Sequence, residues 1–111
     1  MRGAGGGSIV NIASVHALAT VERIAACAAA KDEVIALSRQ MALDVATNRI
    51  RVDAIVAGSV ATGVSRHHAE ATGNTVPPDC FRIEETGLSR LARPEEVAGA
   101  VRFLVVPTRR S

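Results

Sequence analysis

Aromatic residues are nearly absent from this chain of 111 residues, which contains no tryptophan, no tyrosine and only two phenylalanines. Side chains that could stack on exposed bases are therefore scarce. The net charge is only +2, and the arginines are scattered along the sequence, as is typical of a solvated surface. We expect no nucleic-acid partner.

Cysteine and long apolar runs are scarce as well. Cys27 and Cys80 are the two cysteines, and neither belongs to a CxxC pair or to the Cys/His spacing of a zinc site. We expect them to be free thiols in a reducing compartment. Residues 1–8 lack the apolar segment of a signal peptide, and no apolar run is long enough for a membrane span. The sequence therefore predicts a cytoplasmic protein without a metal site or a membrane contact.

Hydrophobic residues make up 48% of the chain and charged residues 22%, which is typical of one globular domain with one core. The β-rich runs 8–13 and 50–56 predict two strands. Between them, residues 24–46 contain no proline and no glycine and predict a long helix. Four apolar residues spaced by three or four positions are expected to form its buried face: Val34, Leu37, Met41 and Val45.

A strand, a helix and a strand in this order form a βαβ unit, so the two strands are expected to be parallel. A last helix is predicted over residues 94–104, because proline suits a first helical turn and the two glutamates that follow suit the positive end of the helix dipole. Two helices are expected to cover only one face of this small sheet properly, and its edges are expected to stay open to other chains.

The connecting residues before and between these elements carry two further predictions. Residues 3–8 nearly fit the dinucleotide fingerprint GxGxxG, but that motif follows a strand and opens a helix. Here the glycines precede a strand, so we interpret them as a flexible turn into it. Residues 59–92 are loop-like, and within them 63–90 are expected to form a substrate lid or a poorly ordered loop.

Four segments stand in the order found in a known family. They are Asn-Ile-Ala-Ser at 11–14, Lys31 in the long helix, residues 51–62 across the second strand and its exit, and residues 91–98 at the last helix. Together they resemble the short-chain dehydrogenase/reductase family over almost the whole chain. The resemblance implies an α/β fold: one partial domain over residues 1–111 with a Rossmann-like, doubly wound parallel sheet.

The resemblance also implies roles for individual residues. Ser14 matches the serine that hydrogen-bonds the substrate oxygen. Lys31 matches the lysine that holds the nicotinamide ribose and lowers the pKa of the catalytic tyrosine. The backbone near Val60, together with Thr62, matches the turn that grips the nicotinamide carboxamide. The implied cofactor is NAD or NADP, and the implied substrate is a small alcohol or ketone.

Two departures from the family pattern bear on activity. Cys27 occupies the position of the catalytic tyrosine in YxxxK, and a cysteine sulfur reaches about 3.5 Å less far from the backbone than a phenol oxygen. We interpret Cys27 as a small buried thiol that fills a gap. In addition, the 111 residues contain no strand, glycine turn and helix to cradle a pyrophosphate. We expect Met1 to fall inside a domain, and the coding sequence before it to encode a Thr-Gly-x-x-x-Gly-x-Gly turn.

Smaller deviations are Asp53 and Ala57, which stand where the family usually has asparagine and proline.

The histidines suggest a weaker alternative to the dehydrogenase function. His16 near Ser14, or Cys27 with His16 or His67, suggests a hydrolase, but no third group is placed to orient such a pair. The adjacent pair at 67 and 68 supplies too few ligands for a metal ion.

Three hypotheses follow. The first is an oxidoreductase that transfers hydride between nicotinamide and an alcohol or ketone, and that is inactive as this chain alone. The second is a non-catalytic protein that assembles with itself or with full-length relatives through the long helix, whose alanine-rich stretch at 25–30 permits close approach. The third is a degenerate reading frame without a function. Cofactor binding separates the first from the others, and co-purification with a full-length relative separates the second from the third.

Overall fold

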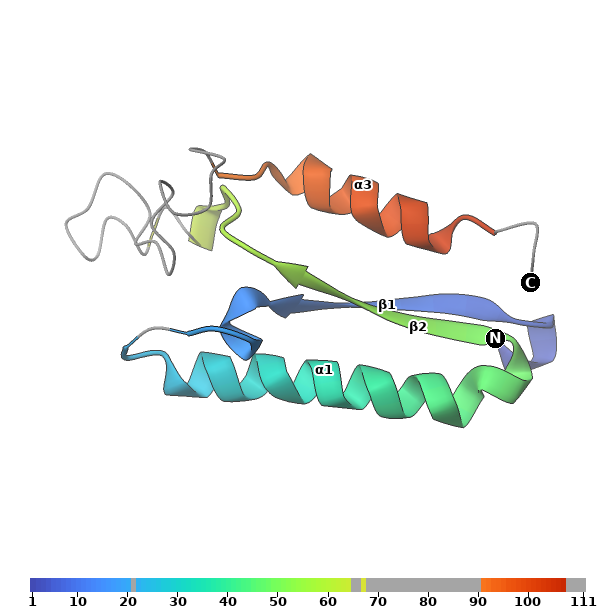
Figure 1. Ribbon diagram of the computed structural model, residues 1–111. Coiled ribbons are helices and arrows are strands. Elements are labelled where there is room, and N and C mark those ends of the chain that lie inside the picture. Colours follow the sequence, from blue (N-terminus) through green and yellow to red (C-terminus); the bar gives the residue numbers. More distant parts are fainter. Residues whose placement is uncertain (21, 65–66, 68–90, 108–111) are drawn as a thin grey trace.

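The computed structural model describes residues 1–20, 22–64, 67 and 91–107. Its main elements in chain order are β1 (Gly7–Ser14), α1 (Ala25–Val45), β2 (Ile50–Ala57) and α3 (Pro94–Val105). Short 3-10 turns lie at Arg2–Ala4, Val15–Ala17 and Ala46–Asn48. The predicted strands, the long helix between them and the last helix are confirmed (Figure 1). The predicted lid lies outside the described residues, apart from residues 63, 64 and 67.

The sheet consists of β1 and β2, which pair in parallel as predicted. The register runs from Gly7 opposite Ile50 to Ser14 opposite Ala57, so both strands end at the same edge of the sheet. Both helices run back in the opposite direction (Figure 1). The amino end of α1 therefore lies at the edge where the strands end, which we call the carboxyl edge.

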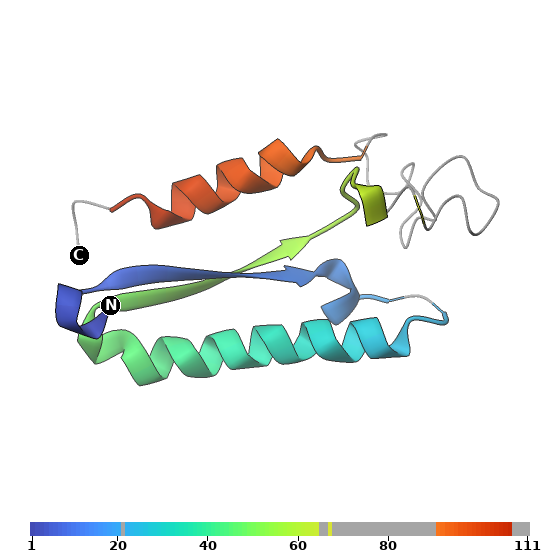
Figure 2. The ribbon, with the colours of Figure 1, turned by 180° about the vertical axis from the view of Figure 1, so that it is seen from behind.

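The two helices lie on opposite faces of the sheet, α1 on one and α3 on the other (Figures 1 and 2). We expected only one face to be covered properly, and although α3 lies on the second face, none of its residues is buried. At the exit from β2, Val60 forms a parallel bridge with Ala92. This bridge sets the start of α3 beside the end of β2, and the helix then runs back along the face that α1 leaves free. The result is a three-layer α/β arrangement, a partial Rossmann-like fold.

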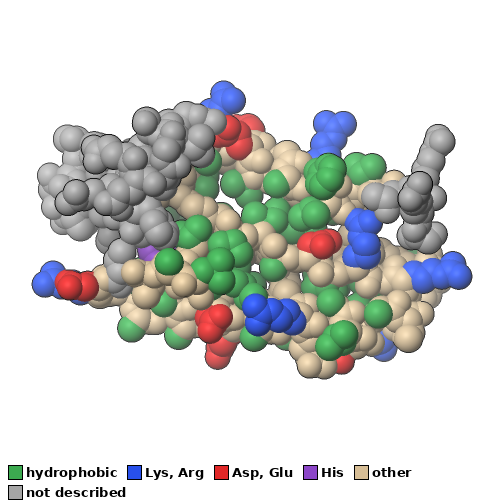
Figure 3. Space-filling model, viewed as in Figure 1, with side chains coloured by type: hydrophobic (Ala, Val, Ile, Leu, Met, Phe, Trp, Pro, Cys, Tyr) green, Lys and Arg blue, Asp and Glu red, His purple; other side chains and the backbone are tan. Residues whose placement is uncertain are grey.

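The core of these layers is small. Among the described residues, only three hydrophobic side chains are buried, namely Ala13, Ile35 and Ile50. Phe103 of α3 is 80% exposed and Leu43 of α1 is 76% exposed. Apolar side chains reach the visible surface along both helices and between them (Figure 3). Each strand pairs on one side only within the described part of the chain, so the open edges that we expected are present.

The buried face of α1 differs from the predicted stripe. Ile35 and Ser38 are its buried residues, whereas Leu37 is 55% exposed. The prediction of Leu37 as part of that face is wrong. A search for apolar residues alone passes over a buried serine. Because an α-helix has 3.6 residues per turn, a buried stripe that contains residue 38 instead of residue 37 is rotated by about 100° around the helix axis. The centre of the helix packs a polar group against the sheet.

The glycine cluster forms a turn into β1, as predicted. Gly5 and Gly6 both have positive φ values, 83° and 138°. The backbone N–H of Gly7 then donates to the carbonyl of Arg49, 3.2 Å away, and this bond joins the start of β1 to the start of β2. The turn therefore lies at the edge of the sheet opposite to the one where the strands end.

Candidate active site

The predicted site residues belong to segments that start or end at the carboxyl edge of the sheet. In open α/β sheets, ligands bind in the crevice outside this edge. Ser14 and Ala57 are the last paired residues of the two strands, and the amino end of α1 reaches the same edge (Figure 1). The residues that sequence reasoning placed in the site are Ser14, Cys27, Lys31, Val60 and Thr62.

Ser14 is half-buried at the end of β1. Its side-chain oxygen accepts a hydrogen bond from the backbone N–H of His16 over 3.3 Å, and thereby caps the short turn that follows. This bond uses one lone pair of the hydroxyl and does not use its proton. Ser14 can therefore donate a hydrogen bond to a substrate oxygen. The contact with His16 comes from a backbone N–H, which cannot act as a base.

Lys31 lies in the second turn of α1 and is half-buried. Its Nζ donates to the carbonyl oxygen of Ile12 over 3.2 Å. Ile12 precedes Ser14 by two residues, so this bond fixes the ammonium group beside the strand that ends in the serine. An ammonium has three protons, and two remain for other acceptors such as ribose hydroxyls.

Cys27 stands one helical turn before Lys31 and is a free, exposed thiol. The interpretation of Cys27 as a buried gap-filling residue is therefore wrong. The physical reason is the length of α1: its 21 residues extend about 31 Å, whereas the eight residues of each strand extend about 26 Å. The amino end of α1 extends past the ends of the two strands (Figure 1), and the thiol of Cys27 is exposed there.

The exit from β2 carries the other two predicted residues. Val60 is half-buried and bridges to Ala92, with the N–H of Ala61 donating to the carbonyl of Ala92 over 2.9 Å. The N–H of Ala92 in turn donates to the carbonyl of Ser59 over 3.0 Å. Thr62 follows with an exposed side chain. The bridge fixes the backbone of this turn at the carboxyl edge, where the resemblance places the nicotinamide.

The histidines add little to this site. His67 is exposed, and residue 68 lies outside the described residues. Within the described ranges, no three His, Cys, Asp or Glu side chains gather as metal ligands would. The hydrolase alternative thus gains no support from any contact described above.

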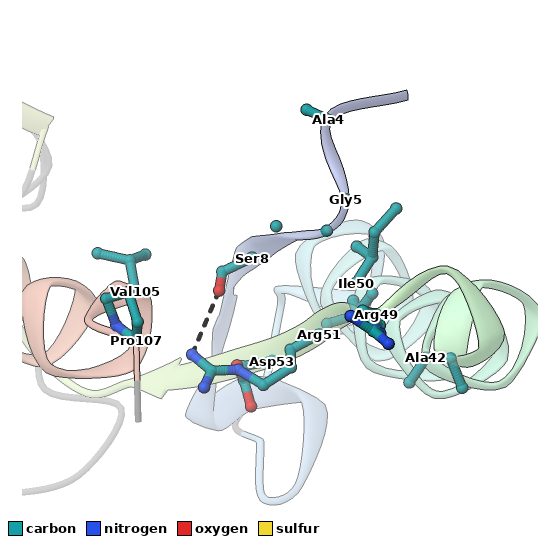
Figure 4. Close-up of a pocket in the computed structure, with 14 residues that line it drawn as sticks. Ala4, Gly5, Ser8, Ala42, Arg49, Ile50, Arg51, Asp53, Val105 and Pro107 are labelled. Atoms are coloured by element: carbon teal, nitrogen blue, oxygen red, sulfur yellow. Dashed lines mark hydrogen bonds between the residues drawn. The ribbon is translucent and has the colours of Figure 1, made fainter. Parts of the chain in front are cut away.

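Sequence reasoning missed an arginine at the opposite edge of the sheet. Arg51 of β2 donates to the side-chain oxygen of Ser8, 3.2 Å away (Figure 4), and also to the carbonyl of Leu104 near the end of α3. These bonds attach α3 to both strands. Arg51 also lines a hollow, together with Asp53 and residues 4–8, that lies at the amino ends of the strands (Figure 4). The sequence contained one signal for this arrangement: the polar residues Arg51 and Asp53 alternate with apolar neighbours along the predicted strand.

Comparison with known proteins places this geometry in a family. Residues 1–111 match the family model described as enoyl-(acyl carrier protein) reductase. The chain belongs to the short-chain dehydrogenase/reductase family. Two relatives come from Xanthobacter autotrophicus, and each is 35% identical over 102 residues and 89% of this chain. They are 2-(S)-hydroxypropyl-CoM dehydrogenase 3, of which the match covers 39%, and the inactive 2-(S)-hydroxypropyl-CoM dehydrogenase 2, of which it covers 43%.

Solved structures of family members share the fold as well. L-sorbose reductase from Gluconobacter frateurii, complexed with NADPH and L-sorbose, is 26% identical and superposes with a TM-score of 0.77 over 95% of this chain and 42% of the reductase. The chain thus spans less than half the length of the family members that it matches. No helix in the described part of the chain is long and apolar enough to cross a membrane.

Proposed function

We propose that this chain supplies the carboxyl-edge part of a dehydrogenase/reductase active site, in which hydride passes between a nicotinamide cofactor and an alcohol or ketone. One observation carries the proposal. The Nζ of Lys31 is held on the carbonyl of Ile12, 3.2 Å away, at the edge where Ser14 ends β1. A cation and a hydroxyl donor are thus both available at the carboxyl edge, where a ribose and a carbonyl substrate would need them.

The residues present fit the nicotinamide end of NAD or NADP. Lys31 would hold the ribose hydroxyls with its two remaining protons, and the bridged turn at Val60 and Thr62 would hold the carboxamide. When bound, the cofactor supplies or accepts the hydride. Ser14 would donate its proton in a hydrogen bond to the substrate oxygen and orient it.

The phosphate end of the cofactor finds no matching cradle in the described residues. Gly5 and Gly6 lie in a turn at the amino edge of the sheet, away from Ser14, and lead into a strand instead of a helix. A pyrophosphate prefers the amino end of a helix that follows a glycine turn. We therefore propose that the chain completes its site only as part of a larger assembly or a longer protein, and that it is inactive alone.

The proton donor is the second requirement that this chain does not meet by itself. A phenol at position 27 would deliver its proton to the substrate oxygen, whereas the exposed thiol of Cys27 is shorter and a weaker donor. Any transfer from Cys27 would have to pass through a water molecule. The free thiol fits a reducing compartment, and we propose a cytoplasmic location.

Assembly without catalysis is the second candidate function. On α1, Leu37 and Leu43 are 55% and 76% exposed, and the small side chains of residues 25–30 near its amino end are mostly exposed as well. Exposed apolar side chains of this kind favour association with a second copy or with a full-length relative. One of the relatives is itself described as inactive, which is in keeping with a non-catalytic role.

A chimeric enzyme tests the catalytic proposal. Residues 7–107 replace the matching segment of a full-length dehydrogenase of the family, with Cys27→Tyr included, and NAD(P)H-dependent turnover is measured. Lys31→Met and Ser14→Ala should each lower kcat/KM of this chimera by about 10²–10⁴-fold. A folded chimera that binds cofactor but whose turnover is indifferent to both substitutions would refute the assignment. Co-purification of the unaltered chain with a full-length relative tests the assembly alternative.

A further inference from the structure

Ser38 is the only buried polar residue in the described part of the chain, with 5% of its surface exposed. It lies in the middle of α1, where alanine would favour the helix by about 0.5 kcal/mol. A hydroxyl buried without a hydrogen bond would cost further free energy. The free-energy cost of a serine at this place must therefore be offset by the hydrogen bonds that it makes.

Those bonds link the helix to β1. The hydroxyl of Ser38 donates its proton to the carbonyl of Val34, one turn earlier, over 2.7 Å. Because the proton is used there, the oxygen can only accept from its other neighbour, the side-chain amide of Asn11, 2.9 Å away. The bond between Asn11 and Ser38 thus joins a side chain of β1 to a side chain of α1.

The position of this bond matters for the carboxyl edge. From Asn11 to Ser14 the strand advances three residues, or about 10 Å. From Ser38 back to Lys31 the helix covers seven residues, or about 10.5 Å. Since α1 runs opposite to β1 (Figure 1), both steps lead to the same edge and end at the same level. A slip of the helix by one turn would displace Lys31 from Ser14 by about 5.4 Å.

We propose that Asn11 and Ser38 form a positioning pair that sets the register of α1 on β1, and thereby holds Lys31 level with Ser14 at the carboxyl edge. An apolar contact tolerates sliding, because hydrophobic attraction has no direction. A partly buried hydrogen bond favours one register, because its loss leaves the side-chain amide of Asn11 without this partner. The catalytic consequence of the pair depends on the function proposed above, whereas the register itself does not.

A spectroscopic test uses the fact that Lys31 is the only lysine in the sequence. Reductive methylation with a 13C label gives one side-chain signal, and the dimethylated ammonium keeps one proton for its bond to Ile12. In the 111-residue chain, Ser38→Ala and Asn11→Ala should each move this signal toward its position in urea, while circular dichroism shows the helix retained. Ser38→Thr, which keeps the hydroxyl, should restore the original position.

Gln40→Ala is the matched control, since Gln40 lies on the same helix and its side chain donates to Asp44 over 2.7 Å in an exposed position. It should leave the Lys31 signal unchanged. An unmoved signal in a folded Ser38→Ala chain, or an equal movement in Gln40→Ala, would overturn the proposal. If the Ser38→Ala chain does not fold, the Lys31 signals of Asn11→Ala and Ser38→Thr decide whether the proposal holds. In the chimera, Ser38→Ala should lower kcat about tenfold. A chimera without any turnover rejects the proposed function and leaves the spectroscopic result standing.

Discussion

A β-carbon built on Gly6 would lie 2.6 Å from the carbonyl oxygen of Arg49. The two residues stand at the starts of the two strands, and the N–H of Gly7 donates to the same carbonyl. Gly6 also has a φ of 138°, a conformation that side chains other than hydrogen rarely allow. Both the close approach of Arg49 and the backbone conformation thus require glycine at position 6. The role of this turn is to bring the two strands together, and not to bind a phosphate.

We predict that Gly6→Ala destabilises the chain by roughly 1–3 kcal/mol, through the strained φ and the contact with Arg49. Gly3→Ala is the control, because Gly3 lies in a 3-10 turn and nothing approaches its β-carbon position within 4 Å. Urea unfolding of the two variants at equal protein concentration measures the difference. Equal stability of the two variants would show that the turn relaxes around the new methyl group.

The isolated chain should bind neither NADH nor NADPH with useful affinity. Lys31, Val60 and Thr62 can contact only the nicotinamide end, and the glycine turn lies at the other edge of the sheet. A titration that follows nicotinamide fluorescence measures the binding, with Lys31→Met as the control for nonspecific signal. Saturable binding in the micromolar range that Lys31→Met abolishes would contradict the prediction.

In the chimeric enzyme, restoring the phenol should restore the proton donor. We predict that the form with Cys27 is nearly inactive and that Cys27→Tyr raises kcat by about 10²–10⁴-fold, the usual contribution of a general acid. Cys27→Phe is the matched control, because it adds the ring without the hydroxyl and should stay inactive. Turnover of the cysteine form within threefold of the tyrosine form would mean that a water molecule or another acid delivers the proton.

Much of the fold could be predicted from the sequence because its strands are β-rich runs and its long helix contains no proline and no glycine. The runs at 8–13 and 50–56 and the uninterrupted helical stretch between them each lie within one or two residues of the observed elements. The family could be predicted for a different reason: Ser14, Lys31 and the segments around them stand in one order, although each segment alone is unspecific.

What could not be predicted depends on contacts between segments that are distant in sequence. The bond between Asn11 and Ser38 spans 27 residues, and a search for apolar periodicity passes over a serine. The bonds of Arg51 join β2 to Ser8 and to the end of α3, so their existence depends on which face α3 covers. No local pattern in the sequence indicates that face, nor the bridge between Val60 and Ala92 at which α3 begins.

Asp53 provides the last prediction, since one of its carboxylate oxygens is buried and has no hydrogen-bond partner in the described part of the chain. A buried acceptor without a partner costs about 1–3 kcal/mol, and more when it carries a charge. Asp53→Asn keeps the shape and removes the charge, so we expect it to stabilise the chain by about 1 kcal/mol. For a domain of this size, thermal unfolding should then shift upward by about 4–8 °C.

The matched control is Asp44→Asn, whose carboxylate lies in an exposed position on α1 and accepts from the side chain of Gln40. This change should alter the midpoint by less than Asp53→Asn does, because an exposed carboxylate is already solvated by water. The resemblance to the family implies asparagine at position 53, so the substitution would return the strand to that pattern. A lower midpoint for Asp53→Asn would show that the buried carboxylate has a stabilising partner in solution, and the hollow beside Arg51 would then be the place to look for it.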